Sequence, residues 1–301
     1  MAKRPKVEPI RAPTLFELQA DSEPTEQAKI VTREIPGVLL GTSSFAAKEW
    51  EGVFYPQGMH SRDFLSYYAK QFRTVEIDST FYGTPKASTV TNWKDKTPPD
   101  FVFAVKIPQV ITHEKILIDC EPEFDEFIQT MTLLGDKLGP LLLQFPKFDK
   151  WTLKSSEDFL ARLDSFLQRV TKPAFRFVVE IRNKNWLGAG LTEFLRERNV
   201  ALALTDTSFM PRPWEMKEPL DLITSDFGYV RWLGDRKGIE QMTPTWNKTI
   251  VDRTDDLRNW VRIARTLVHE RKLRHLFLFA NNHYSGFAPA TVVLFEQIWN
   301  E

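Results

Sequence analysis

Cysteine is almost absent from this sequence of 301 residues, because Cys120 is the only one. A single cysteine excludes an intrachain disulfide and a zinc site built from cysteines. The sequence also lacks an apolar run of about 18 residues, the length that a membrane-spanning helix requires. The N-terminus is basic, but it has no apolar segment of the kind found in secretory signals. We therefore expect a cytosolic protein that makes no membrane contact.

Net charge is missing as well, since 40 Lys and Arg residues balance 40 Asp and Glu residues. Such a balance argues against a protein held on nucleic acid or anionic lipid by bulk charge, and it leaves a local basic groove open. Hydrophobic residues make up 42% of the chain and charged residues 27%, which is typical of a globular protein.

Several motifs that bind cofactors or metals are also absent. The sequence contains no GxGxxG or Walker pattern, no HxH, HExxH or EF-hand spacing, and no GxSxG nucleophile turn. We therefore expect no cofactor and no bound metal.

Short apolar segments recur along the chain and alternate with segments of helical period. Most are rich in β-branched or aromatic residues and have the length of strands buried on both faces of a parallel sheet. The eight segments are Val38–Thr42, Thr74–Asp78, Phe101–Lys106, Pro140–Phe145, Phe175–Ile181, Val200–Asp206, Tyr229–Leu233 and His275–Asn281.

Helices are predicted between most of these segments. The apolar spacing in residues 123–138, for example, places one apolar stripe on a sheet. Pro211, Pro213 and Pro219 interrupt the sixth interval, where loop and short turns are expected. The predicted helices are Ser61–Phe72, Lys86–Lys96, Glu123–Leu138, Ser155–Val170, Leu191–Arg198, Asp255–Lys272 and Ala290–Trp299.

Eight strand-helix units predict an α/β fold, a single-domain TIM-type (β/α)8 barrel over residues 37–301. Residues 1–36 contain scattered prolines and no sustained apolar period, so they are predicted to form an N-terminal extension that is poorly ordered or docked on the barrel. An open doubly wound sheet is the alternative. That fold usually carries a glycine-rich phosphate turn, which is absent here.

Polar side chains gather at the carboxyl ends of the predicted strands, which form the active face of a TIM barrel. A charge within an apolar run is costly unless it is paired or used, so the set predicts a site at the mouth. Glu76, Glu180 and His283 are the candidate catalytic residues, with histidine suited to acid-base chemistry near neutral pH. The candidate ligand-binding residues are Asp78, Lys106, Arg182, Asp206, Arg231, Asn281 and Asn282.

A simpler interpretation applies to each of these residues alone. Strand ends meet water, and Glu180 with Arg182 could form an ordinary structural ion pair. His113 is a second histidine placed near the predicted mouth. Aromatic residues also cluster in the neighbouring loops, including Phe81 and Tyr82, and could stack on a sugar or a base.

Long motifs in this sequence resemble those of the YecE-like family, which carries a domain of unknown function, DUF72. The resemblance covers nearly the whole chain beyond the extension and implies a TIM-type barrel, but it implies no reaction. In one departure, Leu233 stands before Gly234 where the family usually has histidine. The motifs are GTSSFAAKEWEGVFYP (41–56), VEIDSTFYGTP (75–85), FVFAVKIPQVITHEK (101–115), LGPLLLQFP (138–146), VVEIRNKNW (178–186), YVRWLG (229–234) and NNHYSGFAP (281–289).

The leading functional hypothesis is a metal-independent hydrolase that acts on a polar or anionic small molecule at the barrel mouth. Paired carboxylates favour hydrolysis, and guanidinium groups suit a carboxylate or phosphate ligand. The alternatives are a non-catalytic protein that binds nucleic acid or a metabolite, and a divalent-metal phosphodiesterase. The sequence leaves the oligomeric state open.

Overall fold

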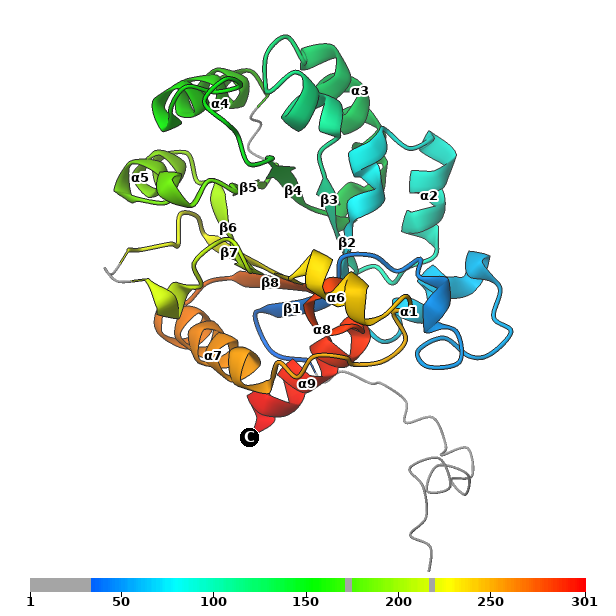
Figure 1. The fold of residues 1–301 in the computed structure, drawn as a ribbon. Coiled ribbons are helices and arrows are strands. Elements are labelled where there is room, and N and C mark those ends of the chain that lie inside the picture. The colour runs from blue at the N-terminus through cyan, green and yellow to red at the C-terminus, as the bar shows by residue number, and fades with distance from the viewer. Residues whose placement is uncertain (1–33, 171–174, 217–219) are drawn as a thin grey trace, which may run out of the picture. The chain divides into compact units, whose positions relative to one another are not determined.

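The computed structural model describes residues 34–170, 175–216 and 220–301. Residues 1–33 of the predicted N-terminal extension lie outside the described part, so the extension stays a prediction. Eight parallel strands alternate with helices and form a nearly closed TIM-type barrel (Figure 1). The strands are β1 (Val38–Thr42), β2 (Thr74–Ile77), β3 (Val102–Lys106), β4 (Leu138–Gln144), β5 (Phe177–Glu180), β6 (Ala201–Thr207), β7 (Phe227–Gly234) and β8 (His275–Ala280).

Helices surround the sheet and bury their apolar faces against it (Figure 1). In the longest, α4, the buried side chains recur at steps of three and four residues, as an amphipathic helix requires. The helices are α1 (Phe64–Tyr68), α2 (Ala87–Asp95), α3 (Glu121–Met131), α4 (Ser156–Val170), α5 (Ala189–Glu197), α6 (Arg236–Met242), α7 (Thr254–Arg265), α8 (Asn282–Ser285) and α9 (Ala288–Asn300). Among the described residues, no helix has both the length and the apolar character needed to cross a bilayer.

The end of α3 and two short helices differ from the predicted helices, whereas the interval between β6 and β7 agrees with the prediction. The helix predicted to reach Leu138 ends as α3 at Met131, because Gly135 takes φ of 61° inside the 3₁₀ turn that follows and Leu138 already belongs to β4. Between β6 and β7 the described residues form only the 3₁₀ turn Pro213–Glu215, in agreement with the prolines there. The short helices α6 and α8 were not predicted, and both follow strands at the mouth.

The barrel interior is filled by small and aromatic side chains from most of the strands. Side chains alternate along a strand, so a position two residues after an interior one also points inward. Lys106 follows Ala104 in this way, Glu180 follows Val178, and Arg231 follows Tyr229. The interior cluster consists of Ala104, Leu142, Val178, Ala201, Ala203, Phe227, Tyr229, Phe277 and Phe279.

The strands β1 and β2 are the two ends of the hydrogen-bonded strand order in the described sheet. The hydroxyl of Tyr68, from α1, joins them: it accepts from the Thr42 amide at 2.9 Å and donates to the Thr74 carbonyl at 3.1 Å. The strands approach so closely that a Cβ on Gly41 would lie 2.2 Å from the Thr74 carbonyl oxygen. We call this junction the β1–β2 seam.

Candidate functional site

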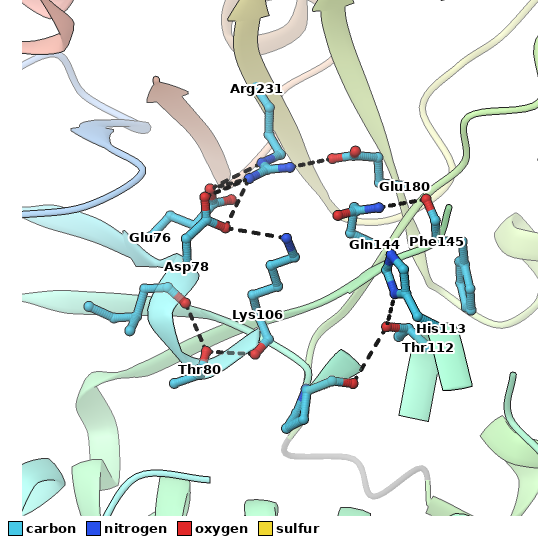
Figure 2. A network of polar contacts seen from close by, with 12 residues as sticks. Glu76, Asp78, Thr80, Lys106, Thr112, His113, Gln144, Phe145, Glu180 and Arg231 are labelled. Carbon is cyan, nitrogen blue, oxygen red and sulfur yellow. Dashed lines mark hydrogen bonds and ion pairs between the residues drawn. The ribbon is translucent and has the colours of Figure 1, made fainter. Parts of the chain in front are cut away.

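Arg231 lies at the centre of a buried ionic cluster below the barrel mouth. Its Nε and Nη2 donate to Oε1 of Glu76 at 3.1 and 2.7 Å, and its Nη1 donates to Oε2 of Glu180 at 2.6 Å. Nη2 also donates to Asp78 at 3.1 Å, and the Tyr229 hydroxyl donates to the second Glu76 oxygen at 2.6 Å. Figure 2 shows Glu76 and Asp78 on one side of the guanidinium and Glu180 on the other. The structure thus brings four of the predicted residues together around one cation.

Burial and pairing shift the pKa values in this cluster in opposite directions. Burial raises the pKa of Glu76, against the lowering effect of Arg231, and the nearby Asp78 carboxylate raises it further. Burial alone would also raise the pKa of Glu180, but Arg231 and Arg182 hold it below its usual value. Both glutamates are enclosed, with exposed fractions of 0% and 1%. Their hydrogen bonds indicate that they hold Arg231 in place.

A cavity of about 720 Å³ lies above the cluster at the carboxyl ends of the strands. Five of its lining residues are cationic and only two carry carboxylates, while Glu76 and Glu180 do not line it. The wall is therefore richer in positive than in negative charge. The charged lining residues are Lys106, Arg182, Arg231, Arg236, Lys237, Asp78 and Asp235.

Lys106 extends from the end of β3 into this cavity. Its Nζ lies 3.8 Å from Asp78 Oδ1 and 4.1 Å from the centre of the Phe81 ring. The Thr80 hydroxyl donates to the Lys106 carbonyl at 2.6 Å, which fixes the backbone there. Burial lowers the pKa of the ammonium group, and the neighbouring Arg231 adds to that effect, while Asp78 opposes it.

Arg182 follows β5 and lines the same cavity. Its side chain is 35% exposed, and its Nε lies 3.4 Å from Glu180 Oε1. The guanidinium also lies over the Phe209 ring at 5.7 Å. Among the described residues, its two terminal nitrogen atoms have no hydrogen-bond partner. These two nitrogen atoms can therefore donate hydrogen bonds to a further anionic group.

Two histidines line the cavity on different elements. Nδ1 of His113, in the π-helical turn Val110–Glu114 after β3, lies 2.8 Å from the Thr112 hydroxyl. Burial lowers the pKa of His113 to about 4, with further lowering by Lys106 and Arg182. His283, in α8, lies 3.4 Å from Glu240, and burial and Arg236 lower its pKa against the effect of Glu240. Neutral imidazoles therefore face the cavity at neutral pH.

The pKa of His113 makes a prediction about stability. The unfolded chain takes up this proton near the ordinary pKa of 6.5, whereas the folded protein takes it up only near pH 4. The contribution of neutral His113 to the free energy of unfolding is therefore fully present above pH 6.5, and it is lost as pH falls toward 4. We expect the free energy of unfolding of the wild type to fall more steeply over this range than that of His113→Gln, as measured by urea denaturation. An equal dependence on pH in the two proteins would contradict the lowered pKa of His113.

Two predicted ligand-binding residues do not line the cavity. Asp206 pairs in register with Trp232, on the outer face of the sheet, and accepts hydrogen bonds from Trp260, Tyr284 and Arg212. The side chain of Asn282 accepts from the amide of Ala288, at the start of α9. By contrast, Asn281 lines the cavity, and its side chain accepts from the His283 amide as the N-cap of α8.

Several residues of the site were not predicted from the sequence. Tyr229 lies within an apolar strand, and only its register two residues before Arg231 signals an inward position. Arg236 and Lys237 belong to the unexpected helix α6, and Phe209 lies in the loop after β6. No motif in the sequence marks these last three.

Within the described ranges, no group of three or more His, Cys, Asp or Glu side chains is arranged to hold a metal ion. The three carboxylates of the cluster instead accept from Arg231.

Comparison with known proteins places the barrel in a defined group. A family model described as "Protein of unknown function DUF72" matches residues 39–301. A crystal structure of a DUF72 family protein from Thermotoga maritima MSB8 superposes with a TM-score of 0.69 at 26% identity, covering 88% of this chain and 99% of that one.

Two curated proteins are similar over shorter segments. The UPF0759 protein YecE of Escherichia coli K12 is 30% identical over 149 residues, which are 48% of this chain and 52% of YecE. The UPF0759 protein YunF of Bacillus subtilis is 37% identical over 98 residues, covering 31% of this chain and 35% of YunF. The matched part thus spans about half the length of YecE and about a third of YunF.

Proposed function

This chain belongs to the DUF72 family of proteins of unknown function, and we propose that its barrel mouth binds a small molecule carrying a carboxylate or phosphate group. Arg182 is the primary anion-binding residue, and Lys106 lines the same cavity. Arg231 has a different role, since its guanidinium already donates to three carboxylates. Arg231 therefore fixes the positions of these carboxylates below the cavity.

This proposal depends mainly on the unpaired terminal nitrogen atoms of the Arg182 guanidinium among the described residues. Arg182 lines a 720 Å³ cavity while both terminal nitrogen atoms lack a partner among the described residues. A planar fork of this kind forms two parallel hydrogen bonds with a carboxylate or a phosphate. The cavity volume also falls within the range of about 300–1,000 Å³ that is typical of small-molecule pockets.

The proposal predicts that Arg182→Gln weakens anion binding. Loss of a charged hydrogen-bonding fork costs about 1.5–3 kcal/mol, which corresponds to about 10- to 150-fold in Kd. A thermal-shift screen with inorganic phosphate, pyruvate and phosphorylated sugars, followed by calorimetry, measures this change. Arg258→Gln is the matched control, because Arg258 lies on α7 and pairs with exposed Asp255. Equal affinity of both variants for every anion that binds the wild type would contradict the proposal.

A metal-independent hydrolase remains the catalytic form of this proposal. The sequence-based hypothesis gave acid and base roles to Glu76 and Glu180, but a ligand in the cavity does not contact either carboxylate, since neither lines it. Asp78 and His283 do line it. A hydrolytic mechanism is therefore best assigned to Asp78 as base and His283 as its partner.

The other hypotheses are distinguished by the same binding assays. A non-catalytic metabolite-binding protein shares the anion site and differs only in showing no turnover. Nucleic-acid binding draws support from Tyr82 and Phe209, which are 80% and 45% exposed at the cavity. It predicts affinity for oligonucleotides that falls steeply with salt. In the part of the chain that the structure describes, no group of three or more His, Cys, Asp or Glu side chains favours the divalent-metal phosphodiesterase.

A further inference from the structure

Two lysines are buried among the described residues, and their surroundings differ sharply. Lys137 donates three hydrogen bonds from Nζ, to the carbonyls of Lys94 and Thr97 at 2.6 and 2.7 Å and to the Thr97 hydroxyl at 3.1 Å. Lys106 is equally buried, with an exposed fraction of 9%. Within the described part of the chain, however, its Nζ has no hydrogen bond and only the 3.8 Å ion pair with Asp78. Lys137 has the contacts of a structural lysine, and Lys106 does not.

The environment of Lys106 lowers the pKa of its amine. Burial is the largest cause and the Arg231 cation adds to it, while Asp78 at 3.8 Å and the Phe81 ring at 4.1 Å favour the charged form. Desolvation together with a neighbouring cation is the combination that activates lysine as a nucleophile in proteins. Unlike Lys137, Lys106 also lines a cavity that admits a ligand.

We propose that Lys106 is a catalytic nucleophile that forms an imine with an aldehyde or ketone bearing a carboxylate or phosphate group. The proposal rests on the anion site described above, because Arg182, which lines the same cavity, would hold the charged group of the substrate. It goes beyond that site by naming the reacting atom, Nζ of Lys106, and the reacting group, a carbonyl.

The chemistry balances without an oxidant or a cofactor. The neutral amine attacks the carbonyl carbon, a carbon–nitrogen bond forms, and one of the two nitrogen protons moves to the carbonyl oxygen to give a carbinolamine. Loss of that oxygen as water then leaves the carbon–nitrogen double bond. Asp78, whose Oδ1 lies 3.8 Å from Nζ, is placed to accept the proton from nitrogen and return it to the leaving hydroxyl.

Reductive trapping tests this step. The full-length protein is incubated with sodium cyanoborohydride and either pyruvate or glyceraldehyde 3-phosphate, and the modified lysines are identified by peptide mass spectrometry. An activated, desolvated amine is expected to react at least about tenfold faster than any other lysine of the chain. The two probes distinguish a carboxylate-bearing from a phosphate-bearing substrate, and modification of Lys106 by either one supports the proposal.

Variants separate this proposal from the anion site. Lys106→Arg keeps the positive charge beside Asp78 and is expected to abolish the adduct. Lys115→Arg, at a partly exposed lysine paired with Glu123, should leave it intact. Arg182→Gln should slow trapping of both anionic probes but not of acetone. If Lys106 reacts no faster than surface lysines with both probes, the imine proposal is overturned. Anion binding that still depends on Arg182 would then show that the proposed function survives.

Discussion

Arg231→Met is expected to lower the free energy of unfolding by about 3–5 kcal/mol, because it leaves buried carboxylates without their cation. Glu76 and Glu180 lose hydrogen bonds at 2.7 and 2.6 Å and have no access to water in exchange. Urea denaturation at pH 7 measures the loss. A value below about 1 kcal/mol would contradict a central role for this guanidinium.

The pH dependence of this loss follows from the pKa of Glu180. Arg231 and Arg182 hold that pKa below its usual value, so the pairing contributes stability above the unfolded pKa that is lost as pH falls. The difference between the wild type and Arg231→Met should therefore shrink toward acid pH. Adding Glu76→Gln and Glu180→Gln to the variant should recover part of the stability, because no unpaired charge remains buried. The control Arg258→Met, at an exposed position, should change stability by less than about 0.5 kcal/mol.

Asp206→Ala is expected to cost about 2–4 kcal/mol without weakening ligand binding. The substitution removes the acceptor of three donor groups. They are Nε1 of Trp260 at 2.8 Å, the Tyr284 hydroxyl at 3.0 Å and Nε of the charged Arg212 at 2.7 Å. Since Asp206 does not line the cavity, anion affinity measured by calorimetry on the folded variant should match the wild type.

Two comparisons sharpen the interpretation of Asp206. Asp255→Ala, at a residue that is 95% exposed, should have an effect below about 0.5 kcal/mol. An Asp206→Ala protein that keeps its stability but loses anion affinity would reverse the assignment and restore the ligand-binding role expected from the sequence.

The barrel could be predicted because its signal is repeated along the chain. Segments such as Val38–Thr42 are apolar, of strand length and separated by helical periods, and the structure confirms all eight strands within a few residues. The residue at which α3 ends was harder to predict from the sequence. A single glycine, Gly135, ends the helical region by its φ of 61°, although the apolar spacing continues beyond it.

The site was harder to predict because a strand end has two faces. The last polar residues of each strand include Glu76, Glu180 and Arg231, which lie together, and Asp206, which lies on the opposite face of β6. Side-chain size indicates which residues of a strand point into the barrel. In β6 the small residues Ala201 and Ala203 lie inside the barrel. Arg236 and Lys237 could not be found in this way, because a helix after a strand places them at the cavity.

The β1–β2 seam has a consequence for association between chains. An exposed sheet edge offers unpaired amides and carbonyls to a strand from another molecule. Here each end strand of the described sheet shields the other, and the contact depends on the Tyr68 hydroxyl and on the absence of a side chain at Gly41. Protection against edge-to-edge aggregation therefore comes from one phenol and one glycine, where a fully closed ring would use a backbone ladder.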